Sequence, residues 1–210
     1  MTGTKIVKLK LEYEGQADGL PQIKGSVVDQ VVGLYNKLKY PEEVVDDSQG
    51  LVERTSEFNL NSGELQMTLM KLENENKDGI TFRVKTGLFL SALMRNSTET
   101  RFQLKPTRDM YYLGWRLSGG KKITVLGDLG NYAGLEMTDC EMHITGDAGS
   151  GTGAHMSNSR ITVDGSTGDS TGAGMKSGTI KVGKKIQHIE PNIEGGEIWE
   201  AGKKVWPKEK

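Results

Sequence analysis

Residues 123–179 consist of three copies of one 19-residue unit, ITVLGDLGNYAGLEMTDCE, MHITGDAGSGTGAHMSNSR and ITVDGSTGDSTGAGMKSGT, and a fourth copy begins with IKVG. The interval is constant in three glycine columns: Gly127, Gly146 and Gly165; Gly130, Gly149 and Gly168; Gly134, Gly153 and Gly172. It is shared by Met137, Met156 and Met175 and by the apolar pairs Ile123/Val125, Met142/Ile144, Ile161/Val163 and Ile180/Val182. So many positions in phase identify an internal repeat.

A single copy cannot bury its few apolar residues, so the copies must stack on one another. A period near 20 with dense glycine fits one rung of a parallel β-helix, whereas helical solenoids need repeats of about 33 residues or more. Equivalent residues then lie above one another at about 4.8 Å, the spacing of paired strands. The glycines occupy corners where a Cβ would clash with the next rung. The sequence predicts a short right-handed parallel β-helix.

The three segments GDLGNYAGLEM, GDAGSGTGAHM and GSTGDSTGAGM resemble the repeats of the GXGXG domain. This domain occurs in the large subunit of glutamate synthase and in one of the subunits of formylmethanofuran dehydrogenase. The resemblance covers residues 120–183. It implies a non-catalytic scaffold within a multi-cofactor oxidoreductase complex. It supplies no catalytic residues, and we expect no cofactor on this chain itself.

The composition changes near residue 114, beyond which glycine, serine, threonine and aspartate dominate. We expect an α+β N-terminal domain over residues 1–107, the β-helix over 108–184, and a C-terminal cap and tail over 185–210. Residues 109–120 resemble a degenerate first rung. In the last part, isoleucines and two tryptophans replace the glycine pattern. These residues are expected to cover the last rung, although Trp199 and Trp206 could instead form a partner-binding surface.

Within residues 1–107, the alternation of residues 5–13 predicts a strand. Ser26 and Asp29 predict the start of a helix that ends before Pro41, because proline stops the helical pattern. An acidic loop is expected over residues 42–50.

Further along the N-terminal part, residues 64–72 and 80–84 alternate around a polar turn with Asp-Gly, which predicts a hairpin. The apolar run 87–94 is compatible with a strand or a helix, because it is too short for its pattern to decide.

Charge and cysteine content exclude several classes of protein. The formal net charge is -1, from 27 basic and 28 acidic residues, which argues against nucleic acid or an anionic membrane as the partner. Cys140 is the single cysteine, so no intrachain disulfide can form. The first residues lack the apolar run of a signal peptide, and no stretch is long enough to span a bilayer. We expect a soluble, cytoplasmic protein.

Few residues suggest chemistry. Glu136 and His155 are one rung apart and form the best acid-base pair, but no nucleophile accompanies them, and a surface charge pair is the favoured interpretation. We expect no basic neighbour in phase with Cys140, which is therefore interpreted as a spectator. Asp128 and Asp147 could hold a cation, although solvated turn residues are favoured. Histidine and cysteine are too few and too scattered for a metal site.

The segment RDMYYLGWR, residues 108–116, is dense in aromatic and charged side chains for a chain with 6% aromatics. Arg108, Asp109, Tyr111, Tyr112 and Trp115 could line a ligand or partner site, together with Glu136 and His155. The favoured alternative is a packing seam between the two parts of the chain. The first hypothesis is therefore a scaffold whose partners are protein subunits or further copies of itself. The second is a stand-alone small-ligand binder or hydrolase with its site at this junction.

Overall fold

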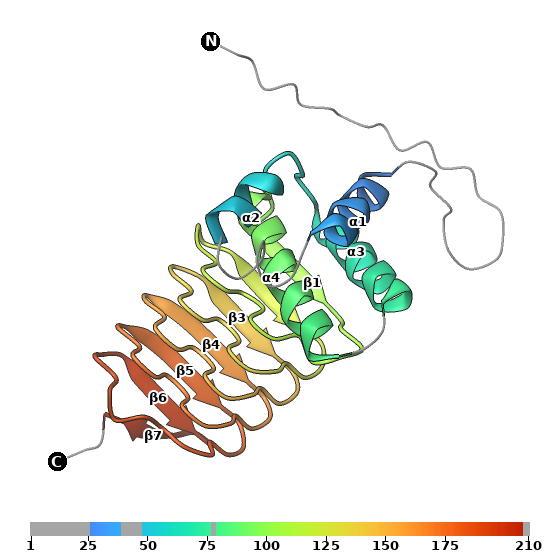
Figure 1. Cartoon of the computed structure of the whole chain (residues 1–210). Coiled ribbons are helices and arrows are strands. Elements are labelled where there is room, and N and C mark those ends of the chain that lie inside the picture. The colour runs from blue at the N-terminus through green and yellow to red at the C-terminus, as the bar shows by residue number, and fades with distance from the viewer. Residues whose placement is uncertain (1–25, 39–47, 77–78, 208–210) are drawn as a thin grey trace, which may run out of the picture.

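The computed structural model describes residues 26–38, 48–76 and 79–207 (Figure 1). In this part of the chain, helices come first: α1 Val27–Lys37, α2 Ser48–Arg54, α3 Ser62–Glu75 and α4 Ile80–Asn96. Strands follow: β1 Arg101–Leu104, β2 Lys122–Val125, β3 Glu141–Ile144, β4 Ser159–Val163, β5 Gly178–Val182, β6 Glu197–Glu200 and β7 Lys203–Trp206. The strand expected at residues 5–13 and most of the acidic loop expected at 42–50 lie outside the described residues.

The strands form one sheet in the order β1 to β7, in which β1 to β6 are parallel. The chain makes about five turns of a β-solenoid, preceded by the helices (Figure 1). Each of the three central strand pairs keeps the 19-residue register: Ile123 pairs with Met142, Met142 with Ile161 and Ile161 with Ile180. The predicted stacking of identical repeat positions is confirmed.

The solenoid begins earlier and ends later than the repeat. β1 pairs with β2 through Phe102 and Ile123, which puts a first strand inside the range 1–107 that we assigned to the N-terminal domain. β6 pairs with β5 through Ile198 and Ile180, inside the range 185–210 assigned to the cap and tail. Paired residues are 21 positions apart between β1 and β2 and 18 positions apart between β5 and β6. The 19-residue period of the sequence therefore does not hold at these two pairs, although the solenoid continues through them.

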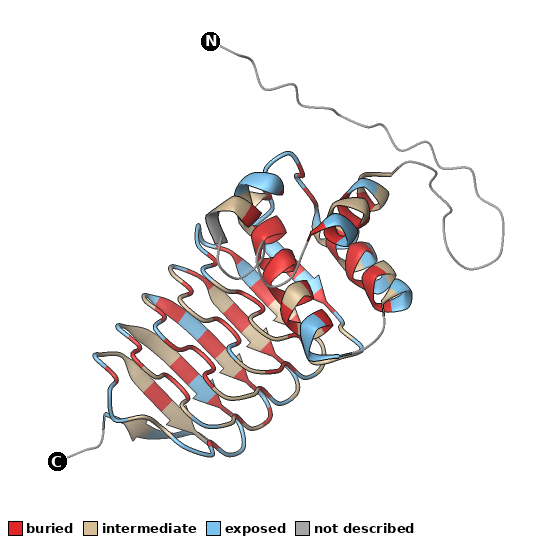
Figure 2. Ribbon diagram, in the orientation of Figure 1, coloured by how far each residue is buried: buried red, intermediate tan, exposed pale blue. Residues whose placement is uncertain are grey.

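Inward side chains form a continuous core through the stack. Successive strand residues point to opposite faces, and the inward ones are buried on every central strand (Figure 2). Met137, Met156 and Met175 are fully buried. The backbone N–H of Ser157 donates to the Met137 carbonyl at 2.9 Å, and that of Lys176 to the Met156 carbonyl at 2.9 Å, so these methionines lie on consecutive turns.

Glycine is required in the repeat for two different reasons. Gly134, Gly153 and Gly172 have φ values of +67°, +69° and +72°, a region that side chains with a Cβ rarely adopt. Gly146 has no such φ, but a Cβ there would lie 2.7 Å from the carbonyl oxygen of Gly127 on the preceding turn. The corners are therefore set partly by backbone conformation and partly by the approach of one turn to the next.

Helix α3 closes the free edge of β1. Its side chains accept the backbone N–H groups that no neighbouring strand satisfies: Ser62 Oγ from Gln103 at 2.8 Å, and Gln66 Oε1 from Lys105 at 2.7 Å. Glu73 Oε1 accepts from the Thr107 N–H at 2.8 Å. An uncovered parallel edge would be a template for pairing with another chain, and this helix removes it.

At the other end, β7 closes the sheet by pairing antiparallel with β6. Ile186, Ile193 and Ile198 are buried, in agreement with the prediction that bulky residues cover the last glycine-rich turn. Trp199 is half-buried, and its indole N–H donates to Glu197 Oε2 at 3.2 Å. The cap is thus one further turn followed by an antiparallel strand. The short edge strand β7 carries two lysines and is followed by Pro207, features that discourage pairing with other chains.

The predicted hairpin of residues 64–72 and 80–84 is wrong, because both segments are helical. Leu65 and Leu69, spaced four apart, suit either a strand or a helix. Leu72 is also fully buried, and its spacing fits only the helix, whereas Met67 of the expected strand face is exposed. Asn61 and Glu64 form a capping box that starts α3, a signal the alternation obscured.

The run 87–94 is part of α4 and is buried all round. This helix packs against α2 and α3 on one side and against the first solenoid turn on the other, so the helices and the solenoid share one continuous core (Figure 1). The Ser91 hydroxyl accepts the Gly114 N–H at 2.9 Å. Gly87 allows the close approach, since a Cβ there would lie 1.8 Å from the Tyr111 carbonyl oxygen.

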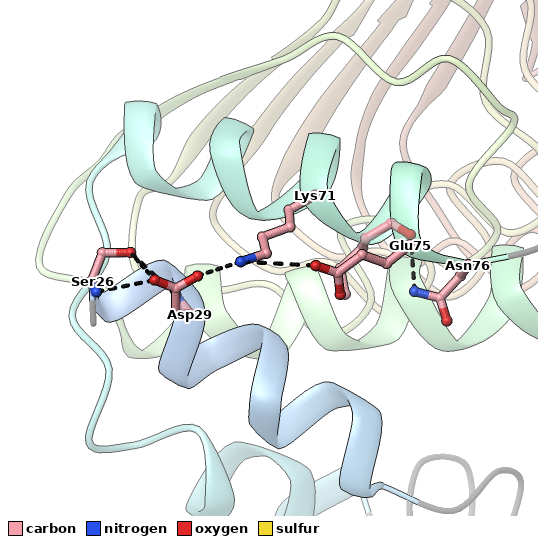
Figure 3. Close-up of polar contacts among 6 residues, drawn as sticks. Ser26, Asp29, Lys71, Glu75 and Asn76 are labelled. Atoms are coloured by element: carbon pink, nitrogen blue, oxygen red, sulfur yellow. Dashed lines mark hydrogen bonds and ion pairs between the residues drawn. The ribbon is translucent and has the colours of Figure 1, made fainter. Parts of the chain in front are cut away.

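The predicted helix after Ser26 is confirmed as α1, and its capping box is present. Ser26 Oγ accepts the Asp29 N–H, and the Asp29 carboxylate accepts the Ser26 N–H (Figure 3). The other oxygen of Asp29 pairs with Lys71 of α3, which in turn lies 3.8 Å from Glu75. The Lys71 ammonium holds the pKa of Asp29 below its usual value. The cap therefore also ties α1 to α3.

The glycine requirement can be tested with Gly146→Ala. The new Cβ meets the backbone of the preceding turn, so we expect a loss of roughly 1–3 kcal/mol in the free energy of unfolding, measured by urea denaturation. Gly33→Ala in α1 is the matched control, because open space surrounds that position. It should stabilise the chain by roughly 0.5–1 kcal/mol. Equal stabilities for the two variants would contradict the stacked geometry.

The helical part predicts a response to alkaline pH. Burial raises the pKa of Tyr35 to about 12, and its hydroxyl lies 2.9 Å from Thr86 Oγ1. In the unfolded chain this tyrosine ionises near pH 10. Its contribution to the free energy of unfolding is therefore complete below pH 10 and is lost as the pH rises towards 12, by at most about 3 kcal/mol. Tyr35→Phe should lack this loss. Denaturation of both proteins at several pH values between 9 and 11 measures this difference. The same dependence of the unfolding free energy on pH in both proteins would refute the prediction.

Candidate functional site

The residues that the sequence grouped at the junction are used in packing and pairing. Arg108 donates to the Asn76 carbonyl at 3.2 Å, and its guanidinium lies 5.1 Å from the ring centre of Phe82. Asp109 pairs with Arg83 of α4 at 3.4 Å. Both contacts attach the first turn of the solenoid to the helices.

The aromatic residues of this segment lie against the repeat. A Cβ at Gly130 would lie 1.9 Å from the Tyr111 ring, which shows how closely that ring covers the glycine. Tyr112 stacks on Tyr132 of the next turn, with ring centres 4.8 Å apart and planes 19° apart. The guanidinium of Arg116 lies 5.0 Å from the Trp115 ring centre. The segment is therefore a seam between the helices and the solenoid.

Glu136 and His155, the best acid-base pair in the sequence, have other neighbours. Glu136 Oε2 accepts from Arg116 Nε at 2.7 Å on the preceding turn. The His155 ring lies over Gly174 of the following turn, where a Cβ would approach it to 2.4 Å. Within the described residues, no hydrogen bond joins the carboxylate to the imidazole.

A groove of about 410 Å³ lies on the outer face of the sheet, next to the N-terminus of α3. It crosses β1 to β4 and is lined by two outward columns that stack across the strands. The first column is Arg101, Lys122, Glu141 and Arg160, and the second is Gln103, Thr124, His143 and Thr162. This volume is in the range of ligand sites.

The groove has an excess of positive charge. Lys122 Nζ lies 3.0 Å from Glu141 Oε1, so these two charges neutralise each other. Within the part of the chain that the structure describes, Arg101 and Arg160 make no ion pair. Both arginines are exposed. Two guanidinium groups are therefore available on the groove for an anionic group from outside.

His143 is held by a carboxylate that the repeat did not reveal. Its Nε2 lies 2.9 and 3.0 Å from the two carboxylate oxygens of Asp164. The two residues are 21 positions apart, so they are not in phase with the 19-residue period. An imidazole held by an aspartate is a possible general base, which would need a nucleophile beside it. The serine that lines the groove, Ser62, instead accepts the Gln103 N–H, and among the described residues no hydrogen bond joins it to His143.

Cys140 does have a basic neighbour in phase, which corrects the sequence interpretation. Lys121, 19 residues earlier, is buried at 6% exposure, and its ammonium donates to the carbonyls of Ser97 and Glu99 at 2.5 and 2.6 Å. Burial lowers the pKa of Lys121 and raises the pKa of the Cys140 thiol. Lys121 thereby joins the end of α4 to the start of β2, and Cys140 is 3% exposed, so its thiol is closed to solvent.

Asp128 and Asp147 bind backbone groups of the next turn. Asp128 Oδ1 accepts the Asp147 N–H at 2.8 Å, and Asp147 Oδ1 accepts the Ser166 N–H at 2.7 Å. Over residues 26–38, 48–76 and 79–207, no group of three or more histidine, cysteine, aspartate or glutamate side chains is arranged to hold a metal ion. Among the same residues, no helix is long and apolar enough to cross a membrane.

Comparison with known proteins finds no matching family model, no matching curated protein and no matching solved structure.

The role of the turn aspartates can be tested at Asp147. Asp147→Asn keeps an oxygen for the Ser166 N–H and removes a like charge next to Asp128, so stability should stay within about 0.5 kcal/mol of the parent or rise. Asp147→Ala removes the acceptor and should cost about 1 kcal/mol. Thermal unfolding with and without calcium measures both. A calcium-dependent rise in Tm that Asp147→Asn abolishes would instead assign these carboxylates to a cation.

Proposed function

We propose that the protein is a non-catalytic scaffold that holds other subunits in a protein complex. Support comes from how the solenoid uses its polar side chains. Asn131 Oδ1 accepts the Ser150 N–H at 2.9 Å, and Ser150 Oγ accepts the Asp169 N–H at 3.2 Å, each on the next turn. The turn side chains that could otherwise act on a substrate are thus used to join one turn to the next.

Partners would attach to the side of the solenoid. Both ends of the sheet are covered, the first by α3 and the last by β7. End-to-end growth into a filament is therefore disfavoured, because neither end offers a free parallel edge. The outer face of the sheet, with its groove and available arginines, is the surface that we propose for a partner.

The resemblance of the repeats to GXGXG domains supports a more specific setting. In glutamate synthase and formylmethanofuran dehydrogenase, this domain is a framework within a multi-cofactor oxidoreductase. We extend the proposal to an oxidoreductase-type complex of the same kind. Redox cofactors would then belong to the partner subunits. A homo-oligomer is the simpler form of the same scaffold.

The stand-alone ligand binder or hydrolase stays a prediction of the sequence. Its expected junction residues are used in the seam between helices and solenoid, and Glu136 pairs with Arg116. The groove on the outer face is the feature that would serve such a function, and it is built from other residues.

The scaffold function predicts that the native protein is part of a larger particle. Gentle lysis of the source cells, followed by gel filtration with immunodetection, should place the chain well above its own mass of 23.0 kDa. Mass spectrometry of that fraction should identify partner subunits in fixed proportion. A chain that elutes as a free monomer at its cellular concentration would contradict the proposal, and the purified chain run alone is the reference.

A further inference from the structure

The outer-face groove combines shape and charge in a way that specifies a ligand. Its first column places Arg101, Lys122, Glu141 and Arg160 on successive strands. Glu141 is used by Lys122, so the charge remaining for a ligand is concentrated on Arg101 and Arg160. These two residues are three strands apart, which corresponds to about 14 Å between their Cα atoms at the spacing of paired strands.

This separation suits an extended chain better than a compact anion. In an extended peptide each residue advances about 3.3–3.4 Å, so side chains four residues apart lie about 13–14 Å apart on one face. Two carboxylates at positions i and i+4 would therefore meet Arg101 and Arg160 together. A phosphate or a small carboxylate is far shorter than this span and would engage one arginine at a time.

The second column offers hydrogen-bonding groups beside that path. Thr124 and Thr162 are half-buried and flank His143, and neither hydroxyl has a hydrogen-bond partner within the described part of the chain. Gln103 continues the column towards α3. A peptide backbone that crosses the strands would find donors and acceptors here, while its acidic side chains face the first column.

A nucleic acid fits the groove less well. Glu141 lies between the cations and would repel a continuous line of phosphates. Phe102, the phenyl ring among the lining, is 3% exposed, and the imidazole of His143 is held by Asp164, so the groove offers no row of free aromatic rings on which successive bases could stack. Protein partners carry isolated carboxylates that can straddle Glu141, whereas a phosphate backbone carries a charge at every nucleotide.

We propose that the groove binds an extended acidic segment of a partner protein, with carboxylates four residues apart on Arg101 and Arg160. The proposal rests on the scaffold function and names the chemistry of its partner. Glu141 acts as a spacer: it neutralises Lys122 and so concentrates the attraction at the two ends of the groove.

Fluorescence anisotropy with the full-length protein tests this assignment. The probe is a labelled peptide with two glutamates at positions i and i+4, and all its other residues are glycine, serine or threonine. The reference peptide has glutamine in place of each glutamate. Binding of the glutamate peptide should exceed that of the reference and should weaken as salt is raised, because exposed charges are screened. Equal binding of the two peptides would overturn the proposal.

Single-residue variants should change the affinity for the glutamate peptide in opposite directions. Arg101→Gln and Arg160→Gln should each weaken binding about two- to fivefold, as expected for an exposed ion pair. Glu141→Gln frees Lys122 and should tighten binding about twofold. Lys203→Gln is the matched control: it removes an exposed lysine from β7, outside the groove, and should leave the affinity unchanged. Weaker binding in Glu141→Gln, or equal losses in the control, would refute the assignment.

Competition distinguishes other ligands. Inorganic phosphate or citrate that displaces the peptide at matched ionic strength would assign the groove to a small anion. A single-stranded oligonucleotide that binds more tightly than the peptide would assign it to nucleic acid. Either result overturns the proposal. If the native chain copurifies with subunits but ignores the peptide, the scaffold function stands and only the groove assignment fails.

Discussion

Hydrogen bonding between consecutive turns is the interaction on which the structure depends. Strands β2 to β5 pair in a constant register, so each side chain of the repeat lies above its counterpart. The turns between them follow the same rule: Gly153 donates to the Ala133 carbonyl and Gly172 to the Thr152 carbonyl, at 2.8 and 2.9 Å. Each position of the repeat must therefore hold a residue that can pack directly above a residue of the same type. Isoleucine and methionine meet this requirement inside the solenoid, and glycine meets it at the corners.

Hydrogen bonding between turns also uses the polar side chains of the turns. Aspartate, asparagine and serine in the turns accept N–H groups of the following turn, as Asp128, Asn131 and Ser150 do. Their oxygens thereby become part of the framework. Outward side chains of the strands are not needed for this hydrogen bonding, because the backbone N–H and C=O groups of a strand already pair with the neighbouring strands. The groove that we propose as a binding surface lies on the outer face of the sheet.

A stack of identical turns has no natural length, and the two ends of this one are closed by different means. At the start, Ser62 and Gln66 of α3 accept N–H groups of β1 and of Lys105 directly after it, while α4 covers the apolar interior of the first turn. At the finish, the chain reverses into β7. The result is a finite solenoid of about five turns in which neither end presents a free parallel edge for further strands.

The sequence by itself determined the solenoid, because stacking converts a constant interval of 19 residues into contact between the residues that share it. It also determined the start of α1 through Ser26 and Asp29. Tertiary structure decided α3 and α4, since Leu65 and Leu69 suit a strand or a helix, and the burial of Leu72 with the exposure of Met67 separates the two. It brought Asp164 to His143 out of phase with the repeat. Local periodicity carries no information about such contacts, because they depend on how distant segments pack.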